Sequence, residues 1–434
     1  MSLRSIASVL ALLVLAGPLA GPLAGPLAAQ EPRQGVRIGL TYAPGTRPGL
    51  YVLPLYGLHA DSIRAVVTRD LDYGDRISVI APDAGLAPTG ALNYPLYARL
   101  GAAAVLQMTI TPAGAVHAVL HDVVAARVIN TADFTVRGSA FGTDWRRSVH
   151  EASDEIERWV TGVRGIAATR VLFIRGATLW TVDSDGMNVM SVTGVGAALA
   201  PVWHPNGTTI GYTEMLDDGT RVVVRDLANG SVRRFVRDRG TNASPAFAPD
   251  GRTLVFASGE DGTDLFSVPL DGSAAPFRVT VGRGSTNSQP TYAPDGRRIA
   301  FTTSRLGAPQ LYITDSDGAN PELLTTSGFG DQLYRADPAW SPDGRFVAFS
   351  TQIEGRFQVA TIGLRDRSVK QHTVDGINED PSWAPDARHL VFTSTRTGSK
   401  QLWVLDTESG RLRQLTSGPA SRMAAWSPRL SPAR

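Results

Sequence analysis

The 434-residue sequence contains no cysteine, which excludes disulfide bonds, thiolate metal ligands, a cysteine nucleophile and a lipid-modified N-terminal cysteine. It also lacks a charge excess, because 42 Lys and Arg stand against 40 Asp and Glu. Nucleic-acid binders normally carry a basic excess or a basic stripe, so this balance argues against that class. The 44 glycines and 28 prolines favour many short strands joined by turns over long helices. The length is typical of two domains.

Long apolar runs are also scarce, and the one exception lies at the N-terminus. Ile6–Ala16 (IASVLALLVLA) follows Arg4, and three GPLA units then occupy residues 17–28. A basic start, a short apolar stretch and small residues before a polar segment indicate a secretory signal peptide, with a buried core helix as the alternative. A membrane-spanning helix would need about 20 apolar residues. We therefore expect residues 1–30 to be a signal peptide and the mature protein to be exported to a periplasm without membrane insertion.

A short motif recurs from residue 201 onward. Its copies start 44, 45, 48, 43 and 43 residues apart, and a period near 40–50 is typical of propellers and solenoids. The third residue of each copy is aromatic and is predicted to pack between neighbouring repeats. The fifth is a proline that presets φ for a turn, and a glycine that accepts positive φ usually follows at the seventh. The copies are PVWHPNG (201–207), PAFAPDG (245–251), PTYAPDG (290–296), PAWSPDG (338–344), PSWAPDA (381–387) and AAWSPRL (424–430).

Each turn leads into an alternating strand and two further short strands, which makes four antiparallel strands per repeat and predicts a propeller blade. The first three-strand set, residues 170–193, has no motif strand before it, and the last motif strand at 424 has no set after it. The last strand is therefore predicted to complete the first blade, which leaves no open sheet edge. This count gives six blades over residues 168–430.

Residues 36–165 do not repeat. Strands are predicted at 51–58, 77–80, 104–109, 116–122 and 131–136, and helices at 60–71, 93–103 and 147–161. The predicted fold class is mainly β, a six-bladed β-propeller preceded by a small α/β domain. The predicted domains are a signal peptide (1–30), an N-terminal α/β domain (31–165) and the propeller (166–434).

The segment 148–174, SVHEASDEIERWVTGVRGIAATRVLFI, resembles the link between the two domains of the TolB family, the periplasmic component of the Tol–Pal system. The ending AAWSPRL is similar to that family's closing strand, and LHDV (120–123) fits its first domain. Departures are Asn206 and Ala387 in the turns and the stretch 41–50. The residues that carry the match in the link are His150, Asp154, Thr161, Gly162, Arg164, Gly165, Thr169 and Arg170.

The sequence shows no catalytic signature. A Gly-x-Ser-x-Gly motif is absent, and His117 and His121, four apart on a predicted strand, are too far apart to share a metal ion. The two Asp-Ser-Asp-Gly-x-Asn stretches at 183–188 and 315–320 favour hairpin turns over calcium loops. His150 and Asp154 lie one helical turn apart, where a contact at the helix surface or a domain interface is favoured over an acid–base pair. We expect no catalytic residue, metal or cofactor.

Binding is the remaining class of function. Polar loops that enter the inner strands should converge at the mouth of the propeller channel, where they can present hydrogen bonds and charges to a docked protein; for any single residue a solvated turn is the alternative. The predicted partner-binding residues are Asn242, Ser244, Asn287, Gln289, Arg335, Asp337, Asn378, Glu379, Asp380 and Arg422.

The resemblance to TolB implies two partners. The channel mouth would receive a Pal-like lipoprotein, and the N-terminal segment Val36, Arg37 and Ile38 would contact a TolA-like inner-membrane protein. We expect a monomer that binds these proteins for envelope integrity and cell division. A propeller-based hydrolase or lyase and a ligand or ion sensor remain alternatives.

Overall fold

The computed structural model describes residues 40, 46–81, 90–237, 240–282, 284–325 and 334–430. The predicted signal peptide and the predicted segment Val36–Ile38 lie outside these residues. Residues from Gly39 onward form one unit, which holds both the α/β domain and the propeller. None of the described helices is long and apolar enough to cross a membrane.

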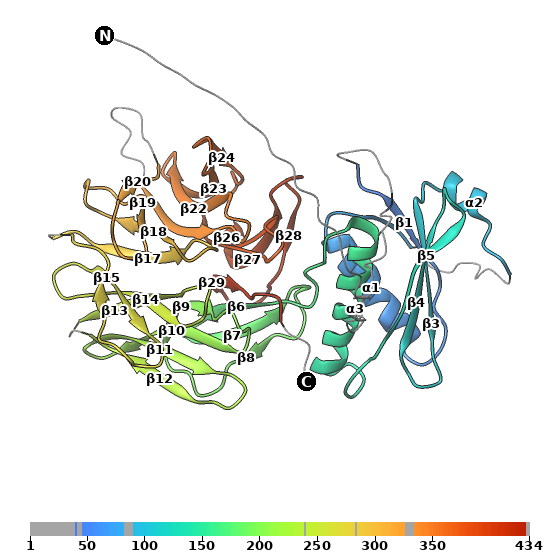
Figure 1. Cartoon of the computed structure of the whole chain (residues 1–434), viewed down its shortest axis with the longest axis horizontal. Coiled ribbons are helices and arrows are strands. Elements are labelled where there is room, and N and C mark those ends of the chain that lie inside the picture. Colours follow the sequence, from blue (N-terminus) through green and yellow to red (C-terminus); the bar gives the residue numbers. More distant parts are fainter. Residues whose placement is uncertain are drawn as a thin grey trace, which may run out of the picture. The chain divides into compact units, whose positions relative to one another are not determined.

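The α/β domain contains a five-stranded sheet in the order β2-β1-β3-β4-β5. Strand β1 runs parallel to β2 and β3, whereas β3, β4 and β5 pair antiparallel. Helices α1 and α3 pack their apolar residues, such as Leu71 and Ile156, against Leu106 and Leu120 of the sheet. The elements are β1 Gly49–Val52, α1 Ala60–Tyr73, β2 Ser78–Ile80, α2 Tyr94–Arg99, β3 Ala104–Ile110, β4 Val116–Asp122, β5 Arg127–Phe134 and α3 Thr143–Thr161 (Figure 1).

Four predicted elements in this domain have bounds that are wrong by more than two residues. The helix predicted at 147–161 begins at Thr143. The strand predicted at 51–58 is Gly49–Val52, because Pro54 cannot continue the ladder. The helix predicted at 93–103 is only Tyr94–Arg99, and Gly101 follows it with φ 83°. Strand β5 begins at residue 127 rather than 131. Its hairpin is tight because the Asp122 carboxylate accepts hydrogen bonds from the next turn's amides, which the alternation pattern does not reveal.

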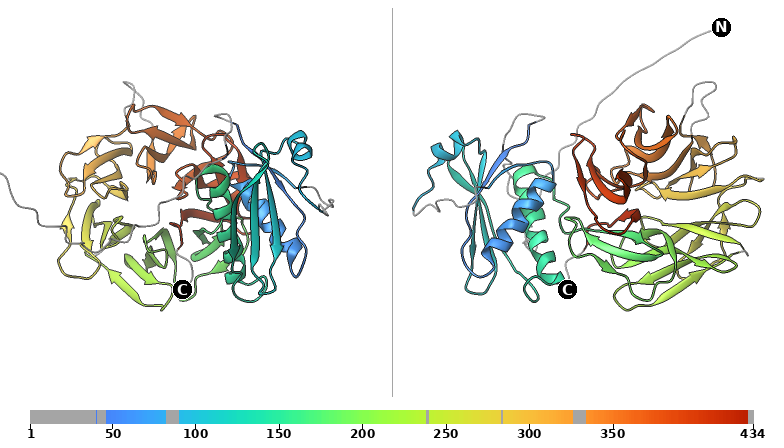
Figure 2. Two further views of the ribbon diagram at one scale, coloured as in Figure 1. Left: turned by 45° about the vertical axis from the view of Figure 1, so that its right-hand side comes forward. Right: turned by 180° about the vertical axis from the view of Figure 1, so that it is seen from behind.

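The propeller consists of six four-stranded sheets, which confirms the predicted fold class. Figure 2 shows the sheets arranged around a central axis, and their inner strands β9, β13, β17, β21, β25 and β29 contact one another in a closed circle. The strands are β6 Arg170–Arg175, β7 Thr178–Asp183, β8 Met190–Ser191, β9 Ala198–Trp203, β10 Thr209–Leu216, β11 Gly219–Asp226, β12 Val232–Phe235, β13 Thr241–Phe247, β14 Thr253–Gly259, β15 Asp264–Pro269, β16 Phe277–Arg278, β17 Asn287–Tyr292, β18 Arg298–Thr303, β19 Gln310–Asp315, β20 Glu322–Leu323, β21 Arg335–Trp340, β22 Phe346–Ile353, β23 Arg356–Gly363, β24 Val369–Gln371, β25 Asn378–Trp383, β26 His389–Thr397, β27 Ser399–Asp406, β28 Leu412–Gln414 and β29 Ser421–Trp426.

The ring is closed by its last strand, as predicted. Strand β29 pairs antiparallel with β6, and the first blade has the order β29-β6-β7-β8. The indole of Trp426 is buried and donates a hydrogen bond to the Thr169 hydroxyl at 2.8 Å. The next residue, Ser427, accepts a hydrogen bond from the Arg170 amide at 3.0 Å. The end of the propeller sequence is thereby held against its beginning.

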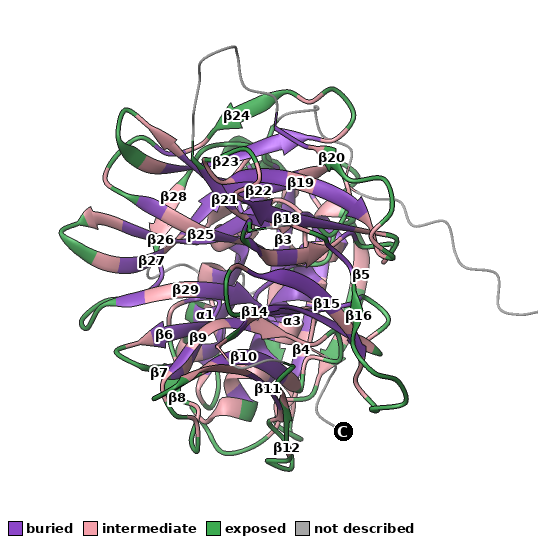
Figure 3. Ribbon diagram, turned by 90° about the vertical axis from the view of Figure 1, so that its left-hand side faces the viewer, coloured by how far each residue is buried: buried purple, intermediate pink, exposed green. Residues whose placement is uncertain are grey.

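One fully buried aromatic side chain occupies the second strand of every blade. Figure 3 shows the buried middle strands and the more exposed outermost ones, such as β24. The motif aromatics also lie between blades: the Trp383 indole donates to the Ala339 carbonyl of the neighbouring blade at 3.0 Å, which confirms their predicted packing. The six core aromatics are Phe173, Tyr212, Phe256, Phe301, Phe349 and Phe392.

Candidate partner-binding channel

Each inner strand is interrupted by a β-bulge directly before the first residue of its motif. The pairing register of β17, for example, shifts between Ser288 and Thr291. A non-glycine residue with positive φ is uncommon and costs about 1–3 kcal/mol. Its recurrence at one position in all six blades shows that the bulge re-aims a side chain toward the axis. The bulge residues are Ala200, Ser244, Gln289, Asp337, Asp380 and Met423, with φ of 45°, 52°, 52°, 55°, 54° and 55°.

Four of the six bulges are stabilised by hydrogen bonds from the preceding blade. In three of them a hydroxyl on the second strand of that blade accepts the bulge N–H, at 3.0 to 3.2 Å. In a fourth, the Asp337 N–H donates to the Gln289 side-chain carbonyl at 3.3 Å. Since an unpaired buried N–H is costly, these bonds compensate the broken ladder. The hydroxyl–amide pairs are Thr213 with Ser244, Ser350 with Asp380 and Thr393 with Met423.

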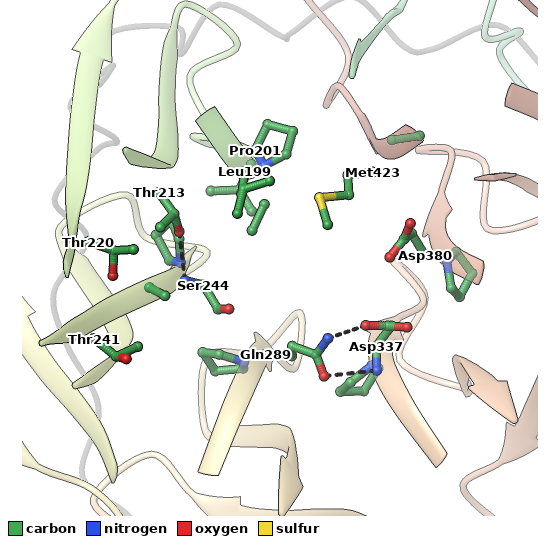
Figure 4. Close-up of a pocket in the computed structure, with 18 residues that line it drawn as sticks. Leu199, Pro201, Thr213, Thr220, Thr241, Ser244, Gln289, Asp337, Asp380 and Met423 are labelled. Atoms are coloured by element: carbon green, nitrogen blue, oxygen red, sulfur yellow. Dashed lines mark hydrogen bonds between the residues drawn. The ribbon is translucent and has the colours of Figure 1, made fainter. Parts of the chain in front are cut away.

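The six bulge residues line a cavity of about 330 Å³ in the bore of the propeller. Figure 4 shows Asp337 and Asp380 on one side of the opening, across from Thr213 and Ser244. Leu199 and Met423 give part of the wall an apolar character. The bore therefore has an acidic side and a less polar side. Its prolines are Pro201, Pro245, Pro290, Pro338 and Pro381.

The two aspartates are held in an environment that disfavours their charge. Burial in the bore, together with the neighbouring Asp380, raises the pKa of Asp337 to about 7. Burial and the charge of Glu379 also raise the pKa of Asp380. Hydrogen bonds from Gln289 to Asp337 and from the Thr393 hydroxyl to Asp380 offset this only in part.

A second cavity of about 310 Å³ adjoins the acidic side. The rings of Tyr334 and Phe357 meet edge to face there, with centroids 5.1 Å apart. The Lys400 ammonium pairs with the Glu379 carboxylate at 2.7 Å, and Arg422 completes the lining. Aromatic and charged groups around a cavity are the features of a protein-binding hot spot.

Comparison with known proteins identifies the family. The family model described as the TolB beta propeller domain, PD40, matches residues 157–430. The chain belongs to the TolB β-propeller family. Two similar curated proteins are both called Tol-Pal system protein TolB: that of Polaromonas naphthalenivorans is 31% identical over 130 residues, 29% of each chain. That of Bordetella pertussis is 28% identical over 181 residues, 30% of this chain and 41% of the other.

The match to these curated TolB proteins thus spans less than half of their length. A solved structure of TolB from Acinetobacter baumannii covers more of the chain. It is 23% identical and superposes with a TM-score of 0.76 over 89% of this chain and 98% of its own. This likeness shows that the fold of both domains is shared.

Within this TolB-family propeller, the predicted partner-binding residues divide into two groups. Ser244, Gln289, Asp337 and Asp380 line the bore, and Glu379 and Arg422 line the adjoining cavity with the two aspartates. The other four are at most 7% exposed and make internal hydrogen bonds. They are Asn242, Asn287, Arg335 and Asn378.

The buried group occupies the first or second position of four inner strands, β13, β17, β21 and β25. The Asn287 amide donates to the Asp264 carboxylate at 2.9 Å and to the Thr263 carbonyl at 3.2 Å. The Asn378 amide donates to the Gln358 side chain at 2.8 Å. These contacts fix the turn that enters the inner strand. Partner contact by this group stays a prediction, and it would require these bonds to be exchanged.

Sequence reasoning missed Met423 and Ala200, which hold the same bulge position as the predicted Ser244 and Asp380. It also missed Phe357 and Lys400, which line the second cavity. A signal for the bulge residues existed, because each directly precedes the first position of a motif copy. Ala200 and Met423 are apolar, so a search for polar loop residues does not find them.

The predicted hairpin turn at 183–188 is confirmed, and its Asp185 contacts the α/β domain from the TolB-family propeller. His150 of α3 bonds Asp70 of α1 at 2.7 Å and lies 3.8 Å from Asp185 of the turn. The groups Asp70, His150 and Asp185 are close enough to ligate a metal ion. However, Arg69 and Arg146 both pair with Asp185. The cluster therefore acts as an ion-pair network between the domains.

His150 and Asp154 bond other groups rather than each other, and both lie where the domains meet, so a domain-interface contact, one of the two alternatives favoured over an acid–base pair, is observed. The Asp154 carboxylate instead accepts the Ala167 amide at 2.6 Å, where the chain enters the propeller. Burial lowers the pKa of His150, but Asp70 and Asp185 outweigh it and leave that pKa raised. Nearby, burial and Asp154 raise the pKa of Glu157 to about 8.

A second contact between the domains uses the turn in which Ala387 replaces the usual glycine. His389, which is fully buried, bonds Asp386 at 2.8 Å and Asp75 of the α/β domain at 3.3 Å. Burial lowers the pKa of His389, but the two carboxylates outweigh it and raise that pKa to about 9. The departure from the motif thus lies where the α/β domain docks.

Proposed function

We propose that this TolB-family protein is a periplasmic protein-binding scaffold of a Tol–Pal-like system. Its bore would receive a Pal-like outer-membrane lipoprotein, and the segment Val36–Ile38 would contact a TolA-like inner-membrane protein. The curated relatives are called Tol-Pal system proteins. The signal peptide prediction supports export, which this role requires.

One observation carries the proposal: all six blades turn a bulge side chain into one bore. The six bulge residues differ in chemistry. In three blades a threonine or serine hydroxyl of the preceding blade accepts the bulge N–H, so the bulge side chain itself remains available for contacts in the bore. Such a ring can contact a docked loop from every side, and the aromatic pair Tyr334 and Phe357 extends the surface at the acidic side. A central cavity with a polar rim is typical of protein recognition.

The test is calorimetric titration with the Pal-like lipoprotein of the same organism, prepared without its lipid. Met423→Arg places a long cation in the bore, and we expect at least a tenfold loss of affinity. Val369→Arg adds the same charge on the outer strand β24, where residue 369 is 54% exposed, and should bind like the parent. A folded Met423→Arg variant with parental affinity would refute the bore assignment.

The second partner is tested separately. Deletion of residues 31–38 from the exported chain should abolish binding to the TolA-like protein while binding to the Pal-like protein is retained. Loss of neither interaction would contradict the proposed role of Val36–Ile38.

A hydrolase remains the second candidate, because two adjacent carboxyl groups with raised pKa values are typical of acid catalysis. Such a reaction also needs a positioned nucleophile or base and a group that stabilises developing charge. No histidine lies among the described residues that line the two cavities. Turnover of peptides or peptidoglycan fragments that is lost in Asp337→Asn would establish the enzyme, whereas its absence favours the scaffold.

A further inference from the structure

We propose that the acidic side of the bore is a subsite for one cationic side chain, an arginine or a lysine, of the docked protein. The inference rests on the proposed function, because it assigns a partner chemistry to the same bore. It names Asp337 and Asp380 as the residues that select this partner.

The geometry presents the two carboxylates together. Asp337 and Asp380 hold the same bulge position on the neighbouring strands β21 and β25, with φ of 55° and 54°. Figure 4 shows their carboxylates on the same side of the opening. Gln289 bonds one oxygen of Asp337, and the Thr393 hydroxyl bonds one oxygen of Asp380 at 3.1 Å. A carboxylate accepts up to about four hydrogen bonds, so both retain acceptor capacity.

No lysine or arginine of the described residues bonds directly to either carboxylate of this pair. Among the residues that the structure describes, no ion pair within 4.0 Å includes Asp337 or Asp380. Lys400 of β27 is engaged by Glu379 of β25, the residue next to Asp380.

The other charged or titratable groups around the pair do not replace the missing cation. Arg422 of β29 and Tyr334, just before β21, line the adjoining cavity with the two aspartates. The Gln289 and Ser350 side chains are neutral donors to Asp337. Lys400 reduces the negative potential at Asp380 without an ion pair to it, and the direct compensation of the two carboxylates comes from hydrogen bonds. A cation from the partner would make the direct ion pair that none of the described residues makes with these two carboxylates.

The rest of the bore fits the stem of such a side chain. Leu199, Pro201 and Met423 line the same cavity, and arginine and lysine bury their methylene stems along apolar surface while the charged head reaches polar groups. A cavity of about 330 Å³ lies at the lower end of the range of small-ligand sites. It therefore accepts one or two side chains rather than a folded element.

Proton linkage gives this subsite a signature. With a pKa of about 7, Asp337 is mostly protonated at pH 6 and mostly ionised at pH 8. A cation binds the ionised form, so binding releases a proton and affinity increases with pH. For one linked proton the increase from pH 6 to pH 8 is about tenfold.

The experiment titrates the parent with the lipid-free Pal-like protein at pH 6 and pH 8, in buffers of different ionisation heat. We expect about tenfold tighter binding at pH 8 and release of up to about one proton. Asp337→Asn and Asp380→Asn should bind more weakly at pH 8, with a flattened pH profile. Glu322→Gln removes a charge that is 52% exposed on the outer strand β20 and should match the parent.

Failure of the subsite and failure of the scaffold give different results. Saturable binding that is equal at both pH values, or that weakens as pH rises, overturns the subsite and leaves the proposed function standing. Parental affinity in both folded asparagine variants does the same. Absence of saturable binding by the parent at both pH values refutes the proposed function and the subsite together. The parent's pH profile requires no variant, so it decides the subsite even if an asparagine variant misfolds.

Discussion

Replacing Trp426 by alanine should open the propeller ring. Trp426 lies on β29, the strand that completes the first blade, and its side chain is 5% exposed. It packs with Val171 and Phe173 of β6 and with residues of the sixth blade. The substitution removes this packing and the indole bond to Thr169.

The expected cost follows from burial. Truncation of a buried tryptophan to alanine costs about 3–5 kcal/mol. A chain of this size loses about 2 °C of Tm per kcal/mol, so Tm should fall by roughly 5–10 °C. Trp180 on β7 of the same blade is the matched control. It is only partly buried, and its indole bonds the nearby Thr178 hydroxyl, so its truncation should cost about half as much.

Scanning calorimetry and limited proteolysis are the assays, since both are independent of tryptophan fluorescence. Trp426→Ala should lower Tm more than Trp180→Ala and should expose the C-terminal strand to protease first. Equal Tm losses for the two variants, with the same cleavage pattern, would show that β29 does not hold the ring closed.

Three further predictions concern buried polar groups. His389→Ala should cost about 3–5 kcal/mol by calorimetry, because it leaves buried carboxylates without their partner. The pKa of His389 is about 9 in the folded protein and 6.5 in the unfolded chain. Protonated His389 therefore stabilises the fold fully below pH 6.5, and this stabilisation is lost as the pH rises through 9. A parent Tm that falls no more than the Tm of the variant between these pH values would contradict this. Glu157→Gln should stabilise the protein by on the order of 2 kcal/mol at pH 8 and by little at pH 4. Burial raises the pKa of Glu157 to about 8 in the folded protein, so ionisation of this side chain at high pH costs folding free energy that the glutamine does not cost. Urea unfolding at both pH values checks this. Asn287→Ala should lower the free energy of unfolding in urea by about 1–3 kcal/mol, because Asp264 and Thr263 lose a hydrogen-bond donor. Unchanged stability would show that these hydrogen bonds do not stabilise the fold.

The propeller could be predicted because its information is local and repeated. Aromatic strands recur with a proline turn after each, and the unmatched three-strand set at the start and the unmatched strand at the end implied the closure that β29 and β6 make. The α/β domain could be predicted less well. Its element types were correct, but Pro54, Gly101 and the Asp122 turn set bounds that periodicity does not contain.

The site could be predicted only as a region. Asn242 and Ser244 are both polar and lie two positions apart, so strand alternation gives them the same face. The bulge separates them: Asn242 is 1% exposed and bonds inside the blade, whereas Ser244 lines the bore. The contact between Asp75 and His389 joins residues of different domains. The local sequence around either residue does not predict it.

The bulge ring also affects how such a protein can change its specificity. One backbone geometry already accepts alanine, serine, glutamine, aspartate and methionine. In three blades the bulge amide is satisfied by a hydroxyl from elsewhere, so its side chain is not required for folding there. In those three blades the bulge residue can therefore be exchanged without loss of the hydrogen bond that holds the bulge. Recognition can drift with a changing partner while the architecture stays constant, and the same positions are the natural starting point for redirecting the protein by design.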